Sequence, residues 1–294
     1  TQQYDLGRER SSEPQYYHMD VEIITRASDG SKAKVETYSM RLTCKPASLS
    51  VGKADTWTCT RFALKIGEGP EVTIPAMVGW SYDFNRSVAI DEHGQVLGIP
   101  HAKFEGLVDS QGKKLDALVA YQVYNQFVQF HAFVDKFAAA DPEGGTGIQD
   151  LKSIGERIVF DEFSDGLPLT VGSTIKEGSV YRPGVETLEF KGLSLVAGKP
   201  CALLGVDGGE GSYTMVIEVA PAVNVETVGG TRYFGDICVD LASNWLKKAD
   251  ITVVDVTETS MGGKVVANTT LESQYRIRAN DRGRGPAHGA TEKE

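Results

Sequence analysis

The longest apolar periodicity in the chain runs from Lys114 to Phe137. Apolar residues recur there at steps of three and four, as in an amphipathic α-helix, and further apolar residues widen this face beyond half of the helix circumference. The polar residues follow one narrow line, and Pro142 with the glycines after it marks the end. A pair of strands is the alternative, because Val, Tyr and Phe favour sheets. Strict alternation fails at 119–121 and 127–128, so we predict one long helix that the rest of the chain must enclose.

The rest of the chain mostly alternates apolar and polar residues, which predicts antiparallel strands separated by turns that contain Gly or Pro. The clearest hairpin surrounds residues 27–31, where an Asp-Gly pair favours a tight turn. Glycine pairs within 207–209 and 261–263 predict two further hairpin turns. Residues 147–163 form a second and weaker helical candidate, because a glycine interrupts them and their Val and Phe favour strand.

These elements predict an α+β fold that is mainly β with one long helix. We expect curved antiparallel sheets, half-barrel or sandwich-like, packed on that helix, and the alternative is a pair of jelly-roll sandwiches joined by it. The last residues contain no apolar anchor and are expected to be disordered. The predicted division of the chain is a polar leader at 1–16, an N-terminal sheet at 17–112, a helical segment at 113–163, a C-terminal sheet at 164–278 and a disordered tail at 279–294.

Composition and charge narrow the range of partners. The sequence has 294 residues, of which 41% are hydrophobic, and it carries a net charge of −10. A negative protein repels the phosphates of nucleic acids, so nucleic acid is not an expected partner. No apolar run approaches the roughly eighteen residues of a membrane span, so no transmembrane segment is predicted. The sequence opens at Thr1 with a polar stretch, as a processed secreted protein or a shortened chain would.

The chain contains four cysteines. Cys44 and Cys59 flank a connection that contains Pro, Gly and Ser, whereas Cys201 and Cys238 lie in or beside strand-like runs. An even number with one close pair is compatible with disulfides in an oxidising compartment, and Cys44–Cys59 is the pairing that we predict. The alternative is that all of them are small buried hydrophobic residues. No CxxC motif or Cys/His cluster suggests a zinc site.

No recognised catalytic or cofactor-binding motif occurs in the sequence, and we predict no catalytic residue, no metal site and no cofactor. His93 and His101 could approach each other across a hairpin, but further metal ligands are lacking. His131, on the predicted helix, is expected to be partly buried and hydrogen-bonded. Acidic residues that follow the helix could supply the paired carboxylates of a glycosidase or oxygen ligands for calcium, and a solvated loop explains them equally well. These residues are Asp150, Glu156, Asp161, Glu162 and Asp165.

The aromatic residues of the predicted helix are the strongest candidates for a functional site. They can fill the concave face of a sheet completely, which is the simpler interpretation. They can also line an apolar cleft if a curved sheet does not close over its helix, and such clefts are the usual form of a lipid or small-hydrophobe site. The candidate ligand-binding residues are Tyr121, Tyr124, Phe127, Phe130, Phe133 and Phe137.

The stretch GGTRYFGDICVDLASNWLKKADITVVDV, at 229–256, contains a glycine-led strand, an Asp-containing turn and a second strand whose residues alternate in and out. This arrangement resembles secreted bacterial proteins of unknown function with a half-barrel sheet, over about residues 167–278. Their fold is similar to that of periplasmic carriers of lipoproteins or lipids, in which a curved antiparallel sheet embraces helices and the ligand lies between them. Where that pattern has a turn glycine after the Asp, this chain has Ser243 and Asn244. The resemblance implies a secreted or periplasmic location and assigns no functional residue.

We therefore expect a non-enzymatic secreted or periplasmic protein that binds an apolar small molecule, a lipid or a protein partner. One alternative is a hydrolase that acts on carbohydrate, and the other is a structural subunit of an extracellular assembly whose exposed strand edges pair between copies. An apolar cleft would favour the first function, and two carboxyl groups facing each other across a groove would favour the second. An exposed edge or a flat apolar surface would favour the third. The sequence does not indicate an oligomeric state.

Overall fold

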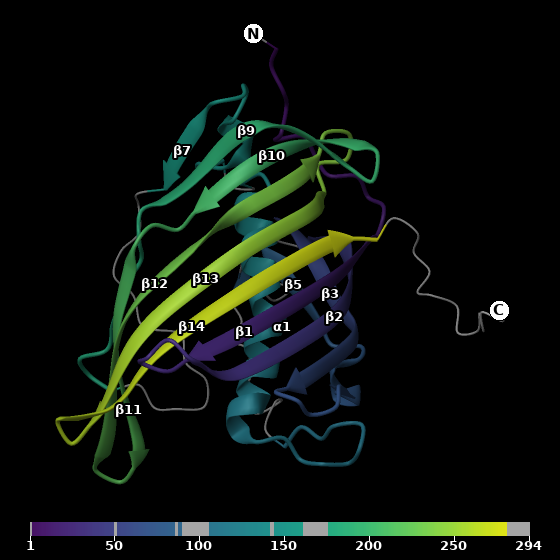
Figure 1. Ribbon diagram of the computed structural model, residues 1–294. Coiled ribbons are helices and arrows are strands. Elements are labelled where there is room, and N and C mark those ends of the chain that lie inside the picture. Colours follow the sequence, from purple (N-terminus) through teal and green to yellow (C-terminus); the bar gives the residue numbers. More distant parts are fainter. Residues whose placement is uncertain are drawn as a thin grey trace.

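The computed structural model describes residues 2–49, 52–85, 88–89, 106–141, 144–160 and 176–280. These residues form one large antiparallel sheet of 14 strands and one α-helix, α1 (Ala117–Phe137) (Figure 1). The strands before α1 are β1 (Gln15–Arg26), β2 (Lys32–Leu49), β3 (Gly52–Ile66), β4 (Val72–Thr73), β5 (Ser81–Asn85) and β6 (Val88–Ala89). The strands after it are β7 (Arg157–Phe160), β8 (Val180–Arg182), β9 (Glu186–Val196), β10 (Lys199–Asp207), β11 (Gly211–Ala220), β12 (Val223–Asp240), β13 (Leu246–Met261) and β14 (Lys264–Ala279).

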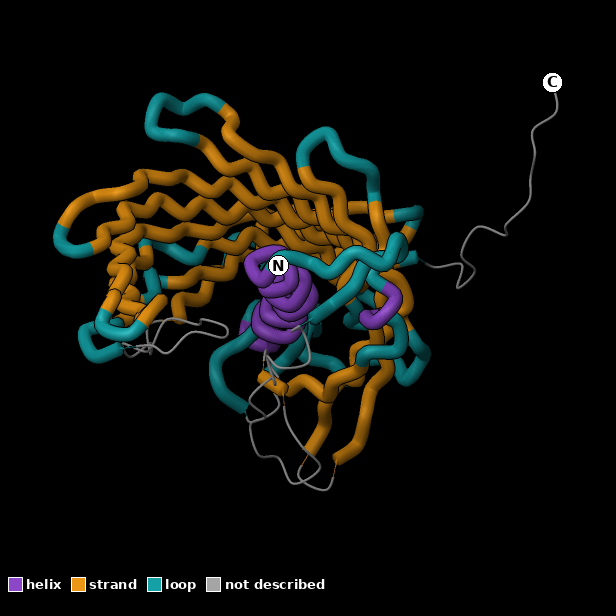
Figure 2. The backbone as a smooth tube through the Cα atoms, turned by 90° about the horizontal axis from the view of Figure 1, so that it is seen from below, coloured by secondary structure: helices purple, strands orange, loops and turns teal. Residues whose placement is uncertain are grey.

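The first and last long strands of the chain lie side by side and join its two halves into one sheet. The strand order is β6-β5-β3-β2-β1-β14-β13-β12-β10-β9-β7, with β11 paired to β12 and β8, and β4 paired to β3. β1 and β14 pair from Tyr17–Ala279 to Arg26–Thr270. The sheet bends around α1, which lies in its concave face (Figure 2). The topology therefore places the helix where residues from both halves of the chain can contact it.

The core lies between the concave face of the sheet and α1. Along β1 the alternate residues Tyr17, Met19, Val21 and Ile23 are buried, because side chains of a strand point in turn to the two faces of its sheet. Full burial of one such side chain stabilises the fold by about 1.5–3 kcal/mol. The helix contributes its own buried residues at helical spacing, and these are Val123, Phe127, Phe130, Val134 and Phe137.

The segment before β1 is tied to both halves of the molecule. Leu6 is buried, and the guanidinium of Arg10 lies 4.4 Å from the ring centroid of Trp245. The same guanidinium donates to the Asp55 carboxylate and to the Ala138 carbonyl, both at 2.9 Å. This N-terminal segment therefore links β3, the end of α1 and the turn between β12 and β13.

The predicted α+β fold class is wrong. The chain is 60% strand and 8% helical, and its strands form one sheet instead of two sheets or two sandwiches. α1 has 21 residues and falls within the stretch of apolar periodicity, but one helix makes no helical layer. The second helical candidate, at 147–163, contains only a 3₁₀ turn (Ile148–Asp150) and β7 among its described residues. The β-branched and aromatic residues of β7 fit the pairing with β9 better than a helix. Residues 281–294 of the predicted tail lie outside the described part of the chain.

Two of the three predicted hairpin turns are present. The turns at 27–31 and 261–263 join the antiparallel pairs β1–β2 and β13–β14. The turn predicted at 207–209 is wrong, because β10 and β11 do not pair with each other and both pair with β12. There the backbone N–H of Gly208 donates to the Tyr233 carbonyl at 2.7 Å. The glycines therefore let the chain bend and continue along the same neighbour.

Candidate functional site

The predicted ligand-binding residues all lie on α1, and the structure describes four of their side chains. The side chains of Tyr121 and Tyr124 lie outside the described part. The described side chains are those of Phe127, Phe130, Phe133 and Phe137, all of which are buried in the core.

These phenylalanines pack against two different parts of the sheet. Phe130 lies 4.6 Å from Trp57 on β3, measured between ring centroids. Phe133 lies 5.6 Å from Tyr233 on β12, on the other side of the helix. Phe127 shares the first environment and Phe137 the second. The structure therefore divides the predicted site into two regions.

His131 is the centre of the first region, where it lies fully buried between α1 and strands β3 and β5. Its ring stacks on Phe84, with 4.1 Å between centroids and 12° between planes, and meets the edge of Trp57 at 4.9 Å. Phe127 and Phe130 approach the same imidazole at 5.1 and 5.5 Å. Rings in contact with these residues complete the group. We call it the His131 cluster, and it consists of His131, Tyr17, Trp57, Trp80, Tyr82, Phe84, Phe127 and Phe130.

Several buried polar atoms of the His131 cluster have no hydrogen-bond partner. Among the described residues, nothing pairs with Nδ1 or Nε2 of His131, with Nε1 of Trp57 or with the hydroxyl of Tyr82. Buried polar groups are paired in the great majority of cases, and each unpaired one costs about 1–3 kcal/mol. The prediction of a partly buried, hydrogen-bonded His131 is therefore wrong on both counts. The cluster combines an apolar wall with several free donors and acceptors.

The imidazole of His131 is neutral in the folded protein. Burial among aromatic rings lowers its pKa well below the ordinary value, because the charged form would lose its hydration. A neutral imidazole offers one donor and one acceptor. Burial also raises the pKa of Tyr82, so its hydroxyl stays protonated. Since the cluster contains no Lys, Arg, Asp or Glu, it suits a neutral polar group better than an ion.

The cluster extends from the core towards one end of the sheet. His131 is fully buried, whereas Trp80 and Tyr82 are partly exposed. β5 is fixed to β3 by backbone pairing and by side-chain hydrogen bonds, such as the one from the Thr56 hydroxyl to Asp83 at 2.5 Å. Trp80 and Tyr82 are therefore the most exposed rings of the cluster.

In the second region each oxygen of the buried Glu186 carboxylate has a partner, one through a hydrogen bond and the other through an ion pair. Glu186 on β9 is 5% exposed, accepts a hydrogen bond from the Tyr233 hydroxyl and forms an ion pair with Lys136 of α1. Phe133 and Phe137 pack on the Tyr233 ring. Burial and the Glu186 charge raise the pKa of Tyr233, which therefore remains a donor. We call these residues the Glu186 region.

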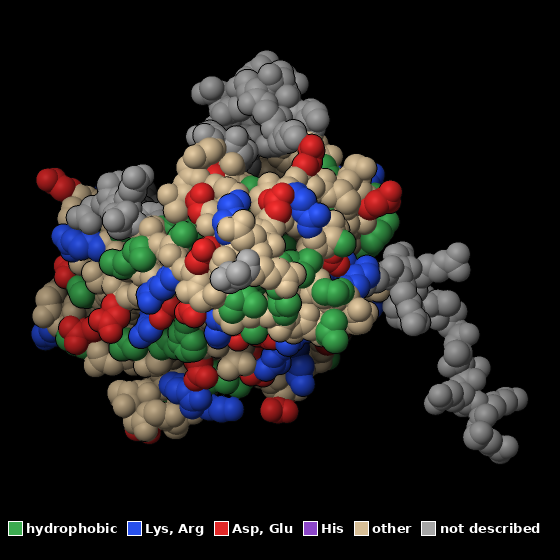
Figure 3. Space-filling view, turned by 90° about the horizontal axis from the view of Figure 1, so that it is seen from above, with side chains coloured by type: hydrophobic (Ala, Val, Ile, Leu, Met, Phe, Trp, Pro, Cys, Tyr) green, Lys and Arg blue, Asp and Glu red, His purple; other side chains and the backbone are tan. Residues whose placement is uncertain are grey.

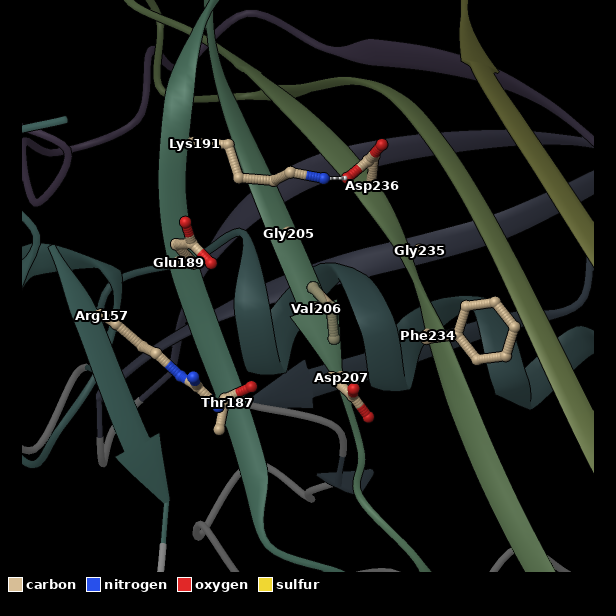
Figure 4. Close-up of a pocket in the computed structure, with 10 residues that line it drawn as sticks. All are labelled: Arg157, Thr187, Glu189, Lys191, Gly205, Val206, Asp207, Phe234, Gly235 and Asp236. Atoms are coloured by element: carbon tan, nitrogen blue, oxygen red, sulfur yellow. Dashed lines mark hydrogen bonds and ion pairs between the residues drawn. The ribbon is translucent and has the colours of Figure 1, made fainter. Parts of the chain in front are cut away.

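A shallow groove of about 380 Å³ lies on the opposite, convex face of the sheet, across β9, β10 and β12 (Figure 4). Lys191 extends over Gly205, where an added Cβ would lie 2.6 Å from its side chain, and its ammonium reaches Asp236 at 2.8 Å. Asp207 accepts hydrogen bonds from Arg232 at 2.6 and 3.2 Å, and this guanidinium lowers the pKa of the carboxyl. A glycosidase acid must hold a proton near neutral pH. Carboxylates paired with cations do not meet that requirement.

A larger hollow of about 610 Å³ lies at the rim of the sheet, between the N-terminal segment and the turn after β12. Its lining includes Tyr16, Lys199 and Lys247. Neither this hollow nor the groove on the convex face is lined by the predicted ligand-binding phenylalanines. The helix packs directly on the sheet through its aromatic rings.

The other candidates from the sequence do not assemble into a site. The carboxylate of Asp150 accepts the backbone N–H of Gly147 at 2.9 Å, and that of Glu156 accepts the N–H groups of Lys152 and Ser153 at 2.5 and 2.9 Å, so both stabilise turns. Within the described residues, no group of three His, Cys, Asp or Glu side chains could hold a metal ion. The candidates outside the described residues are His93, His101, Asp161, Glu162 and Asp165.

The predicted disulfide between Cys44 and Cys59 is absent. Both residues are buried free thiols, as are Cys201 and Cys238. Cys44 lies opposite Trp57 in the β2–β3 pair, whereas Cys59 lies opposite Leu42, so the two cysteines are not direct cross-strand neighbours. The alternative interpretation as small core residues fits their burial. The cysteines therefore do not indicate an oxidising compartment.

Comparison with known protein families and with characterised proteins gave no match to this chain. Over the residues that the structure describes, no helix is both long and apolar enough to cross a membrane. The sequence also missed the strand residues of the site. Trp57, Tyr82 and Phe84 alternate with polar residues on β3 and β5, and this alternation was the available signal.

Proposed function

We propose that the protein is a non-enzymatic binding protein, secreted or periplasmic, that holds an apolar ligand with a neutral hydrogen-bonding group in the His131 cluster. The observation that carries this proposal is the group of unpaired polar atoms on His131, Trp57 and Tyr82 inside a shell of aromatic rings. A curved sheet around a helix is also the arrangement that the resemblance to lipid carriers implies.

The unpaired atoms indicate the chemistry of the ligand. The indole N–H of Trp57 can donate to a hydroxyl or carbonyl oxygen, and the neutral imidazole of His131 can donate or accept beside it. The apolar part of the ligand would lie against the rings of Phe127 and Phe130. A carboxylate is disfavoured, because no cationic residue belongs to the cluster and an unpaired buried charge is costly. A long-chain alcohol or an ester lipid fits these requirements.

Binding requires some separation of α1 from β5, since Phe127 and Phe130 are fully buried. The ligand would replace ring–ring contacts with ring–ligand contacts and would pair polar groups that are otherwise unpaired. The partly exposed rings of Trp80 and Tyr82 mark the side of entry. The bound state therefore gains hydrogen bonds that the free state lacks.

The test uses Nile red, a neutral apolar dye with a carbonyl acceptor, whose emission reports transfer from water to an apolar site. Wild-type protein is expected to bind the dye saturably. His131→Phe keeps an aromatic ring but removes both nitrogens, so affinity should fall about tenfold while the free protein becomes no less stable. Phe133→Leu, in the Glu186 region, is the matched control and should leave affinity unchanged.

Competition then identifies the class of ligand. Dodecanol should displace the dye from wild-type protein, and ionised dodecanoate should displace it much less effectively. The proposal fails if wild-type protein binds no dye, or if His131→Phe and Phe133→Leu alter affinity equally.

A further inference from the structure

One end of the sheet carries an unpaired stretch of strand. β9 pairs with β10 along one edge, whereas its other edge is covered only at 186–190, by β7 and by hydrogen bonds of Gly155 and Glu156 with Phe190 at 2.7 and 2.9 Å. From Gly192 to Val196, no described residue pairs with that edge. Figure 1 shows this part of β9 at the rim of the sheet. We call residues 192–196 the open β9 edge.

The open β9 edge has the side chains of a pairing strand. Leu193 is 48% exposed and Leu195 is 73% exposed. Leu193 lies opposite the buried Ala202, so both leucines point to the inner face. No charged residue or proline occurs between Lys191 and Lys199, although such residues are the usual protection of natural edge strands. Apolar side chains lie among charged ones on the face seen from above (Figure 3).

A second open edge lies at the start of β14 and is better protected. β1 pairs with β14 only from Thr270 onward, so Lys264 to Thr269 extend beyond it. This stretch carries a charge at Lys264, and the β13–β14 register shifts beside Val265. Charges and bulges of this kind discourage pairing with another chain. On β9 the register shift and the nearest charge both lie at Lys191, immediately before Gly192, so neither device falls within the open β9 edge itself.

We propose that the open β9 edge pairs antiparallel with the same edge of a second copy of this chain, about a two-fold axis at Ser194. In this register Leu193 faces Leu195 of the partner subunit, and Gly192 faces Val196 of the partner subunit. The edge is thus complementary to itself, with leucine opposite leucine and no like charges opposed. The pairing joins the two sheets into one continuous antiparallel sheet. The proposed dimer contact lies at the end of the sheet away from β5, and it does not depend on the His131 cluster.

The expected dimer is weak and reversible. A pairing confined to residues 192–196 buries less than the roughly 1,200 Å² of a standard interface. Sedimentation velocity over a wide range of protein concentration should therefore show a monomer–dimer equilibrium in wild-type protein. Leu195→Lys places a charge against an apolar neighbour and should abolish the dimer. Val265→Lys is the matched control, because Val265 is 53% exposed at the other open edge, and it should leave the equilibrium unchanged.

Cross-linking tests the register itself. Residues directly opposite in an antiparallel pair come close enough for a disulfide, whereas diagonal neighbours are too far apart. An equal mixture of Leu193→Cys and Leu195→Cys should form a disulfide-linked dimer on mild oxidation, and neither variant alone should do so. The native thiols are buried and are present in both single variants, so those variants also control for cross-links through a native thiol. Wild-type protein that stays monomeric at the highest concentration, equal effects of the two lysine variants, or equal cross-linking of the single cysteine variants would each overturn the proposal.

Discussion

The His131 cluster and the Glu186 region lie on two sides of the same helix and are built from the same kinds of ring. In the Glu186 region, the Tyr233 hydroxyl and the Lys136 ammonium both contact the buried carboxylate. In the His131 cluster, the ring nitrogens of His131 and Trp57 have no partner among the described residues. Aromatic content therefore does not distinguish a packing region from a candidate site. The two regions differ in whether their buried polar groups have partners.

The two regions also differ in how their buried polar groups are paired. A buried carboxylate is among the most costly groups to leave unpaired, and Glu186 has its partners. Among the described residues, buried side-chain atoms without a hydrogen-bond partner also occur on Gln126 and Asn244, but those on His131, Trp57 and Tyr82 gather in one cluster, and this grouping supports a ligand there.

The largest expected effect comes from truncating a phenylalanine in each region. Phe130→Ala and Phe137→Ala each remove a fully buried ring and should lower the free energy of unfolding by about 3–5 kcal/mol. Urea denaturation of the two variants measures the losses. Dodecanol should restore part of the stability of Phe130→Ala and none of that of Phe137→Ala, because only the first cavity adjoins unpaired polar atoms. Equal recovery of both variants would remove the distinction between the regions.

A smaller effect is expected from breaking the ion pair of the Glu186 region. Lys136→Met keeps much of the apolar stem but leaves the Glu186 carboxylate buried without its cation. Stability should fall by about 1–3 kcal/mol, the usual penalty for a buried group that loses its partner. Lys191→Met is the control, since Lys191 pairs with Asp236 and both side chains are exposed, so its loss should cost less. Urea midpoints compare the two variants, and equal losses would contradict the assignment of Glu186 as a buried structural group.

Local sequence patterns identified strands and some turns but not their partners. The turn at 261–263 joins neighbouring strands, and its glycines are a sufficient signal. The glycines at 207–209 wrongly predicted a hairpin turn, because the two flanking strands both pair with β12 and not with each other. The pairing of β1 with β14 joins opposite ends of the chain, and no local sequence pattern indicates it. Two sheets were therefore predicted where one exists.

The candidate site shows the same limit. Helical periodicity placed Phe127 and Phe130 on an apolar face, and both are in the core. Trp57 and Phe84 were missed, because the inner face of a strand becomes known only with its register. The unpaired state of His131 depends on everything that surrounds it in three dimensions. No spacing along the chain could have predicted it.

A pH titration distinguishes the neutral His131 from the other ionisable groups. Burial lowers the folded-state pKa of His131, whereas the unfolded chain protonates it near pH 6.5. Wild-type stability is therefore unaffected by protonation of His131 above about pH 6.5 and falls as the pH drops below it, by up to about 1.4 kcal/mol per pH unit. The difference in urea stability between His131→Phe and wild type should grow with this slope on acidification, since the remaining groups titrate in both proteins. A constant difference across this range would show that His131 is hydrated in the folded protein.

The smallest effect is expected from the reduction of thiols. A Cys44–Cys59 disulfide would contribute about 3 kcal/mol, so dithiothreitol should leave the urea midpoint unchanged if both thiols are free.

Burial raises the pKa of Cys59 to about 12 and that of Cys201 to about 11, which suppresses the reactive thiolate in native protein. Cys201 lies opposite Ser194 of the open β9 edge, whereas Cys59 lies in the middle of the β2–β3 pair. Since edge strands open more readily than central ones, a thiol reagent should label Cys201 before Cys59 under native conditions, as peptide mapping can show. Faster labelling of Cys59 would contradict this expectation and would mean that the sheet opens first beside the His131 cluster.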